Sequence, residues 1–136
     1  MSPQKAKVIL NIRAPFPVLG KHLIADFYGA RHLVDHKPAE TIFAQAAKKG
    51  GATLLGIEMH DFGERSGFTG VAILAESHIS IHTWPEHQHA AIDIFMCGDA
   101  DPRLSLAVLE RYFQPSQSDV QLIERGARAT TPIGAL

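Results

Sequence analysis

Apolar and polar residues alternate along several short segments of the chain, with the period of two that is typical of a half-buried β-strand. The clearest case is 90–96, in which Ile92, Ile94 and Met96 would lie on one face of a strand. In 76–86, two isoleucines alternate with serine and histidine. The pattern predicts strands at 21–28, 53–59, 69–75, 90–96 and 120–124, and a further strand in 76–86 that ends at Pro85.

Two segments have the period of an amphipathic helix instead. In the first, 38–49, a proline suits the first helical turn and a glycine pair at 50–51 ends the helix. The second begins at Asp101-Pro102, a capping residue followed by a first-turn proline. The predicted buried faces consist of Ile42, Phe43, Ala46 and Ala47 in the first helix, and of Leu106, Leu109 and Phe113 in the second.

Sequential strands with two interspersed helices predict an α+β fold, a two-layer sandwich of one mainly antiparallel sheet with helices on one face. The other face of the sheet then needs cover, and a second copy of the chain is the simplest candidate. We therefore expect a homodimer with paired sheet faces. Residues 1–18, with Pro15 and Pro17, would form an arm or extra edge strand, 19–136 a single domain, and the tail after Gly126 a loose end.

Composition narrows the class of protein. The 136 residues carry 13 basic and 14 acidic side chains, so no charge excess points to nucleic acid or to a membrane surface. Apolar runs are too short to cross a membrane, and residues 1–18 lack the features of a signal peptide. A single cysteine, Cys97, cannot form an internal disulfide. These features predict a cytoplasmic protein.

The stretch 76–86 carries most of the candidate chemistry. His78 and His82 have the i, i+4 spacing of helical zinc ligands, but the alternating isoleucines predict a strand. His87 and His89 add imidazoles, yet no cysteine pair or carboxylate–histidine spacing completes a four-ligand set. We therefore expect no metal site. A polar-faced strand without chemistry remains the alternative from the residues alone.

A resemblance extends this interpretation. The run ESHISIHTWPE at 76–86, followed by AAID at 90–93 and CGD at 97–99, resembles the small prokaryotic S-adenosylmethionine decarboxylase proenzyme family. So do GKHLIADFY at 20–28 and GVA at 70–72, and the likeness covers roughly 19–125. Two departures are Thr69, where the family usually has serine, and the run His87-Gln88-His89.

The resemblance implies a self-cleaving enzyme. Decarboxylation of an α-amino acid needs an electron sink, and in this family a pyruvoyl group is made from the chain itself. Ser77 would attack the carbonyl of Glu76, giving a β chain of 1–76 and an α chain of 77–136 whose pyruvoyl forms a Schiff base with the substrate. The resemblance implies His82 as the proton acceptor in this processing and Cys97 as the proton donor in catalysis.

Further roles follow from the same resemblance. Thr69 would support processing through its hydroxyl, Phe62 would stack on the adenine of S-adenosylmethionine, and Glu86 would bind its ribose. The expected activity is S-adenosylmethionine decarboxylation for spermidine synthesis. An altered pocket around Phe62 and 87–89 leaves a second activity open, the pyruvoyl-dependent decarboxylation of arginine or ornithine. The alternative that is not an enzyme is a metal-binding module that never cleaves itself.

The spacing of Ser77 and His82 raises a problem of reach. Five residues along a straight strand span about 16 Å, and residues an odd number apart point to opposite faces. Either the chain bends sharply between them, or His82 serves the Ser77 of another protomer. We therefore predict a homodimer whose sites mix residues from both chains.

Overall fold

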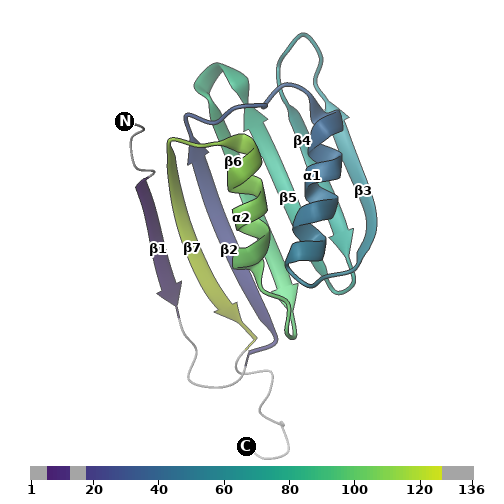
Figure 1. Ribbon diagram of the computed structural model, residues 1–136, viewed down its shortest axis with the longest axis vertical. Coiled ribbons are helices and arrows are strands. Elements are labelled where there is room, and N and C mark those ends of the chain that lie inside the picture. The colour runs from purple at the N-terminus through teal and green to yellow at the C-terminus, as the bar shows by residue number, and fades with distance from the viewer. Residues whose placement is uncertain (1–5, 13–17, 127–136) are drawn as a thin grey trace, which may run out of the picture.

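The structure is a computed structural model that describes residues 6–12 and 18–126 (Figure 1). A seven-stranded sheet in the order β1-β7-β2-β6-β5-β4-β3 carries two helices on one face. The strands are β1 (Ala6–Ile12), β2 (Gly20–Tyr28), β3 (Leu54–Asp61), β4 (Phe68–Leu74), β5 (Ser77–Trp84), β6 (His89–Cys97) and β7 (Gln117–Arg125); the helices are α1 (His36–Lys49) and α2 (Pro102–Phe113). The predicted α+β sandwich is confirmed.

Neighbouring strands pair antiparallel except β1, which lies parallel to β7 at the edge of the sheet. The segment 6–12 is therefore an added edge strand, whereas Pro15, Pro17 and the tail after Gly126 fall outside the described residues. Among the described residues, no helix is long and apolar enough to span a membrane.

Helix α1 begins at His36, two residues before the predicted start, because the Asp35 side chain caps it by accepting from the Lys37 amide at 3.1 Å. Asp101 caps α2 in the same way, through the Arg103 amide at 3.0 Å. Strand β3 extends through His60 and Asp61, two residues beyond the strand predicted at 53–59, because both residues pair with β4.

The core lies between the sheet and the helices. Every second residue of β6 is buried, so the predicted alternation of Ile92, Ile94 and Met96 is confirmed. The predicted faces of both helices are buried too, apart from Ile42, which packs at the margin of the core. The opposite face of the sheet, hereafter the open face, carries no helix from the described residues (Figure 1).

Candidate active site

The predicted site residues divide between the two ends of the sheet. The β4–β5 hairpin and the turn that follows β6 lie at the bottom of Figure 1, and the β3–β4 and β5–β6 connections lie at the top. We call the group Glu76, Ser77 and Cys97 the serine end, and Thr69 and His82 with the two upper connections the histidine end.

The serine end is built on a two-residue hairpin. Leu74 and Ser77 are the last register pair of β4 and β5, so Ala75 and Glu76 alone make the turn. Glu76 has a φ of +63°, in the left-handed region. A residue with a side chain is held there at a cost of about 1–3 kcal/mol. The bond predicted to break therefore follows a strained residue.

Cys97 contacts both sides of that bond. Antiparallel register places His78 opposite Phe95, which brings Cys97 across from the turn. Its backbone amide donates to the Ser77 Oγ at 3.3 Å, and its thiol donates to the Glu76 carbonyl oxygen at 3.0 Å. A donor on this oxygen draws charge from the carbonyl carbon and would stabilise an oxyanion formed there. The predicted nucleophile and electrophile thus meet a hydrogen-bond donor within one chain.

At the histidine end, Thr69 and His82 are a register pair on neighbouring strands, and the threonine Oγ1 lies 3.1 Å from the His82 Nδ1. Strand β5 is unbroken from Ser77 to Trp84 and pairs in regular register on both sides. A sharp bend between Ser77 and His82 is therefore absent. The two residues stay about 16 Å apart along the strand.

The predicted substrate contacts lie near the histidine end. Phe62 follows β3 and is 57% exposed, with its ring against that of His60 at 4.8 Å between centroids. Glu86 lies in the short 3-10 helix η1 (Pro85–His87) of the β5–β6 connection and is exposed. Neither residue is in the group around Ser77.

The structure also contains a polar cluster that the sequence interpretation missed. The Asp93 Oδ2 accepts from the Nε2 of His22 at 2.7 Å and of His78 at 2.8 Å, and its Oδ1 accepts from the Ser80 hydroxyl. Arg125 donates from Nη1 to the Nδ1 of His22 at 3.2 Å. We call these five residues the Asp93 cluster. Only cross-strand register brings them together, although alternation does assign His78 and Ser80 to one face.

Electrostatics favour an ionised Asp93. Partial burial acts to raise the pKa of this carboxyl, but hydrogen bonds from Ser80, His22 and His78 and the charge of His78 outweigh it. The pKa of Asp93 is therefore lowered from its ordinary value of 3.8.

The imidazole nitrogens of His22 and His78 and an Asp93 oxygen lie within 4.8 Å of one another, as three ligands of a metal ion would. However, because Arg125 donates to the Nδ1 of His22, the proton of that imidazole lies on Nε2 and points at Asp93. A metal ligand would need a free lone pair at this nitrogen. The arrangement favours a hydrogen-bonded network over a metal centre.

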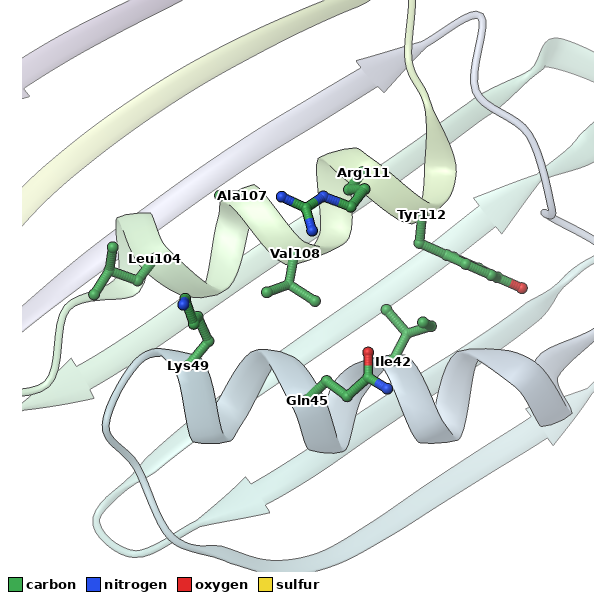
Figure 2. A pocket seen from close by; sticks show the side chains of 8 residues that line it. All are labelled: Ile42, Gln45, Lys49, Leu104, Ala107, Val108, Arg111 and Tyr112. Carbon is green, nitrogen blue, oxygen red and sulfur yellow. The ribbon is translucent and has the colours of Figure 1, made fainter.

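Two hollows in the described part of the chain are large enough to bind a small molecule. One, of about 280 Å³, lies on the open face between the Asp93 cluster and His82. The other, of about 520 Å³, lies between α1 and α2, where apolar side chains such as Val108 adjoin the cations Lys49 and Arg111 (Figure 2). None of the predicted site residues lines the larger hollow.

Comparison with known proteins agrees with the fold. The family model described as S-adenosylmethionine decarboxylase matches residues 21–126. The chain is 42% identical over 111 residues to an S-adenosylmethionine decarboxylase proenzyme of Methanococcus maripaludis, covering 79% of this chain and 90% of that protein. A proenzyme of the same name from Thermomicrobium roseum is 36% identical over 109 residues, covering 79% and 94%.

A solved structure leads to the same class. The crystal structure of the adenosylmethionine decarboxylase from Aquifex aeolicus has a TM-score of 0.72 and 34% identity, covering 80% of this chain and 92% of that one. Fold and sequence similarity together define a small α+β decarboxylase whose relatives are named as proenzymes. The chain belongs to the S-adenosylmethionine decarboxylase family. The predicted resemblance is confirmed.

Proposed function

We propose that this protein cleaves itself between Glu76 and Ser77 and then decarboxylates S-adenosylmethionine, which supplies the aminopropyl donor for spermidine synthesis in the cytoplasm. Membership of the family supports the reaction. The observation that carries the proposal is the position of Cys97, whose thiol and amide hold the Glu76 carbonyl oxygen and the Ser77 Oγ. The family match does not favour arginine or ornithine as the substrate.

The cleavage chemistry uses the contacts of the serine end. The Ser77 Oγ attacks the Glu76 carbonyl carbon, and the acyl group moves from the residue 77 nitrogen to this oxygen. A base, proposed to be His82, takes the Cα proton of residue 77 as the Cβ–Oγ bond breaks, so the oxygen leaves on the new Glu76 carboxylate. Water hydrolyses the resulting dehydroalanine, the nitrogen departs as ammonia, and a pyruvoyl group remains. The Cys97 thiol stabilises the oxyanion of the first step.

The residues present suit that group. Ser77 supplies the oxygen that leaves, and the Cys97 backbone amide contacts that oxygen at 3.3 Å. When formed, the pyruvoyl carbonyl would take up the electrons left as carbon dioxide departs. The Cys97 thiol would return a proton to the substrate Cα, because its S–H group is a proton donor beside residue 77.

We propose further that His82 acts on the Ser77 of a partner protomer, with Thr69 holding its imidazole. The straight course of β5 supports this, since it keeps His82 from its own serine. The open face also carries exposed apolar side chains suited to burial against a second copy: Ile24, Tyr28, Ile73 and Trp84. In such a dimer the histidine end of one chain, with Phe62 and Glu86 as substrate contacts, meets the serine end of the other.

Mass spectrometry and a substrate assay test the proposal. The purified protein should separate into chains 1–76 and 77–136, the second lacking a serine at its start. Carbon dioxide should be released from S-adenosylmethionine and not from arginine or ornithine. A chain that stays whole would refute the cleavage, and release only from a free amino acid would refute the substrate.

A further inference from the structure

Cleavage at the proposed bond would divide the Asp93 cluster between two chains. His22 belongs to the segment 1–76, and the other members belong to 77–136. The sheet is interleaved in the same way, because four of its six neighbouring strand pairs join one segment to the other. Helices α1 and α2 are linked across the same division by the Ser105 hydroxyl, which donates to the Ala46 carbonyl at 2.6 Å.

The chemistry of cleavage removes the contacts that position residue 77. The hairpin peptide is cut, so β4 no longer holds the start of β5 through the turn. The residue 77 nitrogen leaves as ammonia, and the Oγ that accepts from the Cys97 amide leaves with Glu76. His78 becomes the first intact amino acid of the new chain. It directly follows the pyruvoyl group that residue 77 becomes.

The side chain of His78 is held by groups that cleavage does not touch. Its Nε2 donates to Asp93 at 2.8 Å, and the same oxygen accepts from His22 at 2.7 Å. The Phe95 ring stacks on His78 at 6.1 Å and meets His22 edge-on at 5.3 Å. That ring needs Gly20, since a Cβ there would overlap the Phe95 ring.

We propose that the Asp93 cluster is a positioning device that fixes the pyruvoyl end of the α chain after cleavage and fastens it to the β chain through His22. This inference rests on the proposed self-cleavage. Asp93 and its partners would not touch the substrate; they would hold the reacting carbonyl through His78. Because a displacement of about 1 Å at a reacting centre costs up to about 100-fold in rate, the cluster should affect kcat more than KM.

The test compares Asp93→Asn with Asp119→Asn, an equivalent substitution on β7 where the carboxylate accepts from the side-chain amide of Gln117 at 2.9 Å. Both variants should cleave as the parent does. Asp93→Asn should lower kcat by about 10-fold to 100-fold with little change in KM, and Asp119→Asn should leave both unchanged. If Asp93→Asn cleaves and keeps the parent kcat, the positioning role is wrong; if it fails to cleave while the parent does, the cluster acts earlier and the proposal is again wrong. A parent that stays whole would instead refute the proposed function.

Hydrogen exchange separates positioning from general stability. In the cleaved protein, Asp93→Asn should speed exchange of the amides of 78–80. In a Ser77→Ala background, where the hairpin stays intact, the same substitution should leave these amides protected. Equal acceleration in both backgrounds would reduce the cluster to a fold-stabilising role.

Two further measurements complete the test. His78→Gln retains a side-chain N–H donor and should restore part of the kcat that His78→Leu loses. Metal analysis of the purified protein should find no stoichiometric metal that depends on Asp93. One zinc per chain, lost in Asp93→Asn, would assign the cluster to a metal and overturn the proposal.

Discussion

The two ends of the sheet differ in which predicted catalytic contacts a single chain makes by itself. At the serine end, Cys97 contacts both the Ser77 Oγ and the Glu76 carbonyl oxygen, so the predicted nucleophile and electrophile are held together. At the histidine end, Thr69 and His82 contact each other. A strand that is continuous from Ser77 to Trp84 keeps the two groups apart. One chain thus brings Cys97 to the predicted cleavage bond but keeps His82 away from it. This arrangement is expected if each active site of a dimer combines the serine end of one chain with the histidine end of the other.

Mixing two inactive variants tests whether the ends belong to different chains, and it has the largest expected effect. Ser77→Ala and His82→Ala should each lose all measurable decarboxylation. When both are co-expressed, a mixed dimer contains one site with an intact Ser77 and an intact His82. Activity of about half the parent value per mixed dimer should return, as measured by carbon dioxide release.

The control for mixing is co-expression of Ser77→Ala with a Ser77→Ala, His82→Ala double variant, which offers no intact Ser77. If the mixture of single variants stays as inactive as this control, both residues serve the same chain and the half-site comparison fails.

Removing the thiol tests the serine end alone. Cys97→Ala deletes the donor to the Glu76 carbonyl, and loss of one such donor costs about 100-fold to 1,000-fold in rate. Cleavage followed by intact mass should slow by this order, and decarboxylation by any cleaved protein should fall further.

Cys97→Ser separates the two expected roles of this residue. A hydroxyl can still donate to the carbonyl, so cleavage should largely recover, whereas its high pKa makes it a poor proton source for turnover. Recovery of both steps with serine would argue against a special need for the thiol.

A charge on the open face tests whether that face is covered. Ile73 on β4 is 51% exposed on the open face, and Leu104 on α2 is 46% exposed on the helical side. Ile73→Asp should therefore shift the protein from dimer to monomer and lower decarboxylation severalfold, because an unpaired buried charge is costly. Light scattering after size exclusion measures the mass.

Leu104→Asp is the matched control, since the same change is made at similar exposure on the other layer. It should leave mass and activity as they are. A dimer that is lost with Leu104→Asp and kept with Ile73→Asp would move the interface to the helices.

Much of the fold could be predicted because its signals are local. Alternation identified β6, capping and periodicity identified both helices, and neither signal depends on residues far away in the chain. The parallel pairing of β1 with β7 could not be predicted in this way, because strand order is decided by contacts far apart in the sequence. The strand predicted at 53–59 ended too early, because its continuation through His60 and Asp61 depends on pairing with β4.

The site was predictable in part for a similar reason. The resemblance supplied Ser77 and Cys97, but their contact depends on the register of His78 with Phe95, which no local pattern contains. The Asp93 cluster was missed entirely, because its members come from four neighbouring strands and have no common spacing.

Acid unfolding has the smallest expected effect. It tests whether the Asp93 carboxylate is stabilised in its ionised form in the folded chain. The pKa of Asp93 is lowered below 3.8 in the folded chain, so the unfolded chain binds its proton first as the pH falls. The stabilisation from this carboxylate should be fully present above about pH 4 and should disappear as the pH falls from 3.8 through the folded pKa. Urea unfolding between pH 6 and about pH 2.5, in a Ser77→Ala background that keeps one chain, should give Asp93→Asn a flatter acid slope than the parent. Asp119→Asn is the control for replacing an aspartate by asparagine. An unchanged slope in Asp93→Asn would mean that the histidine and serine partners do not lower the pKa of Asp93.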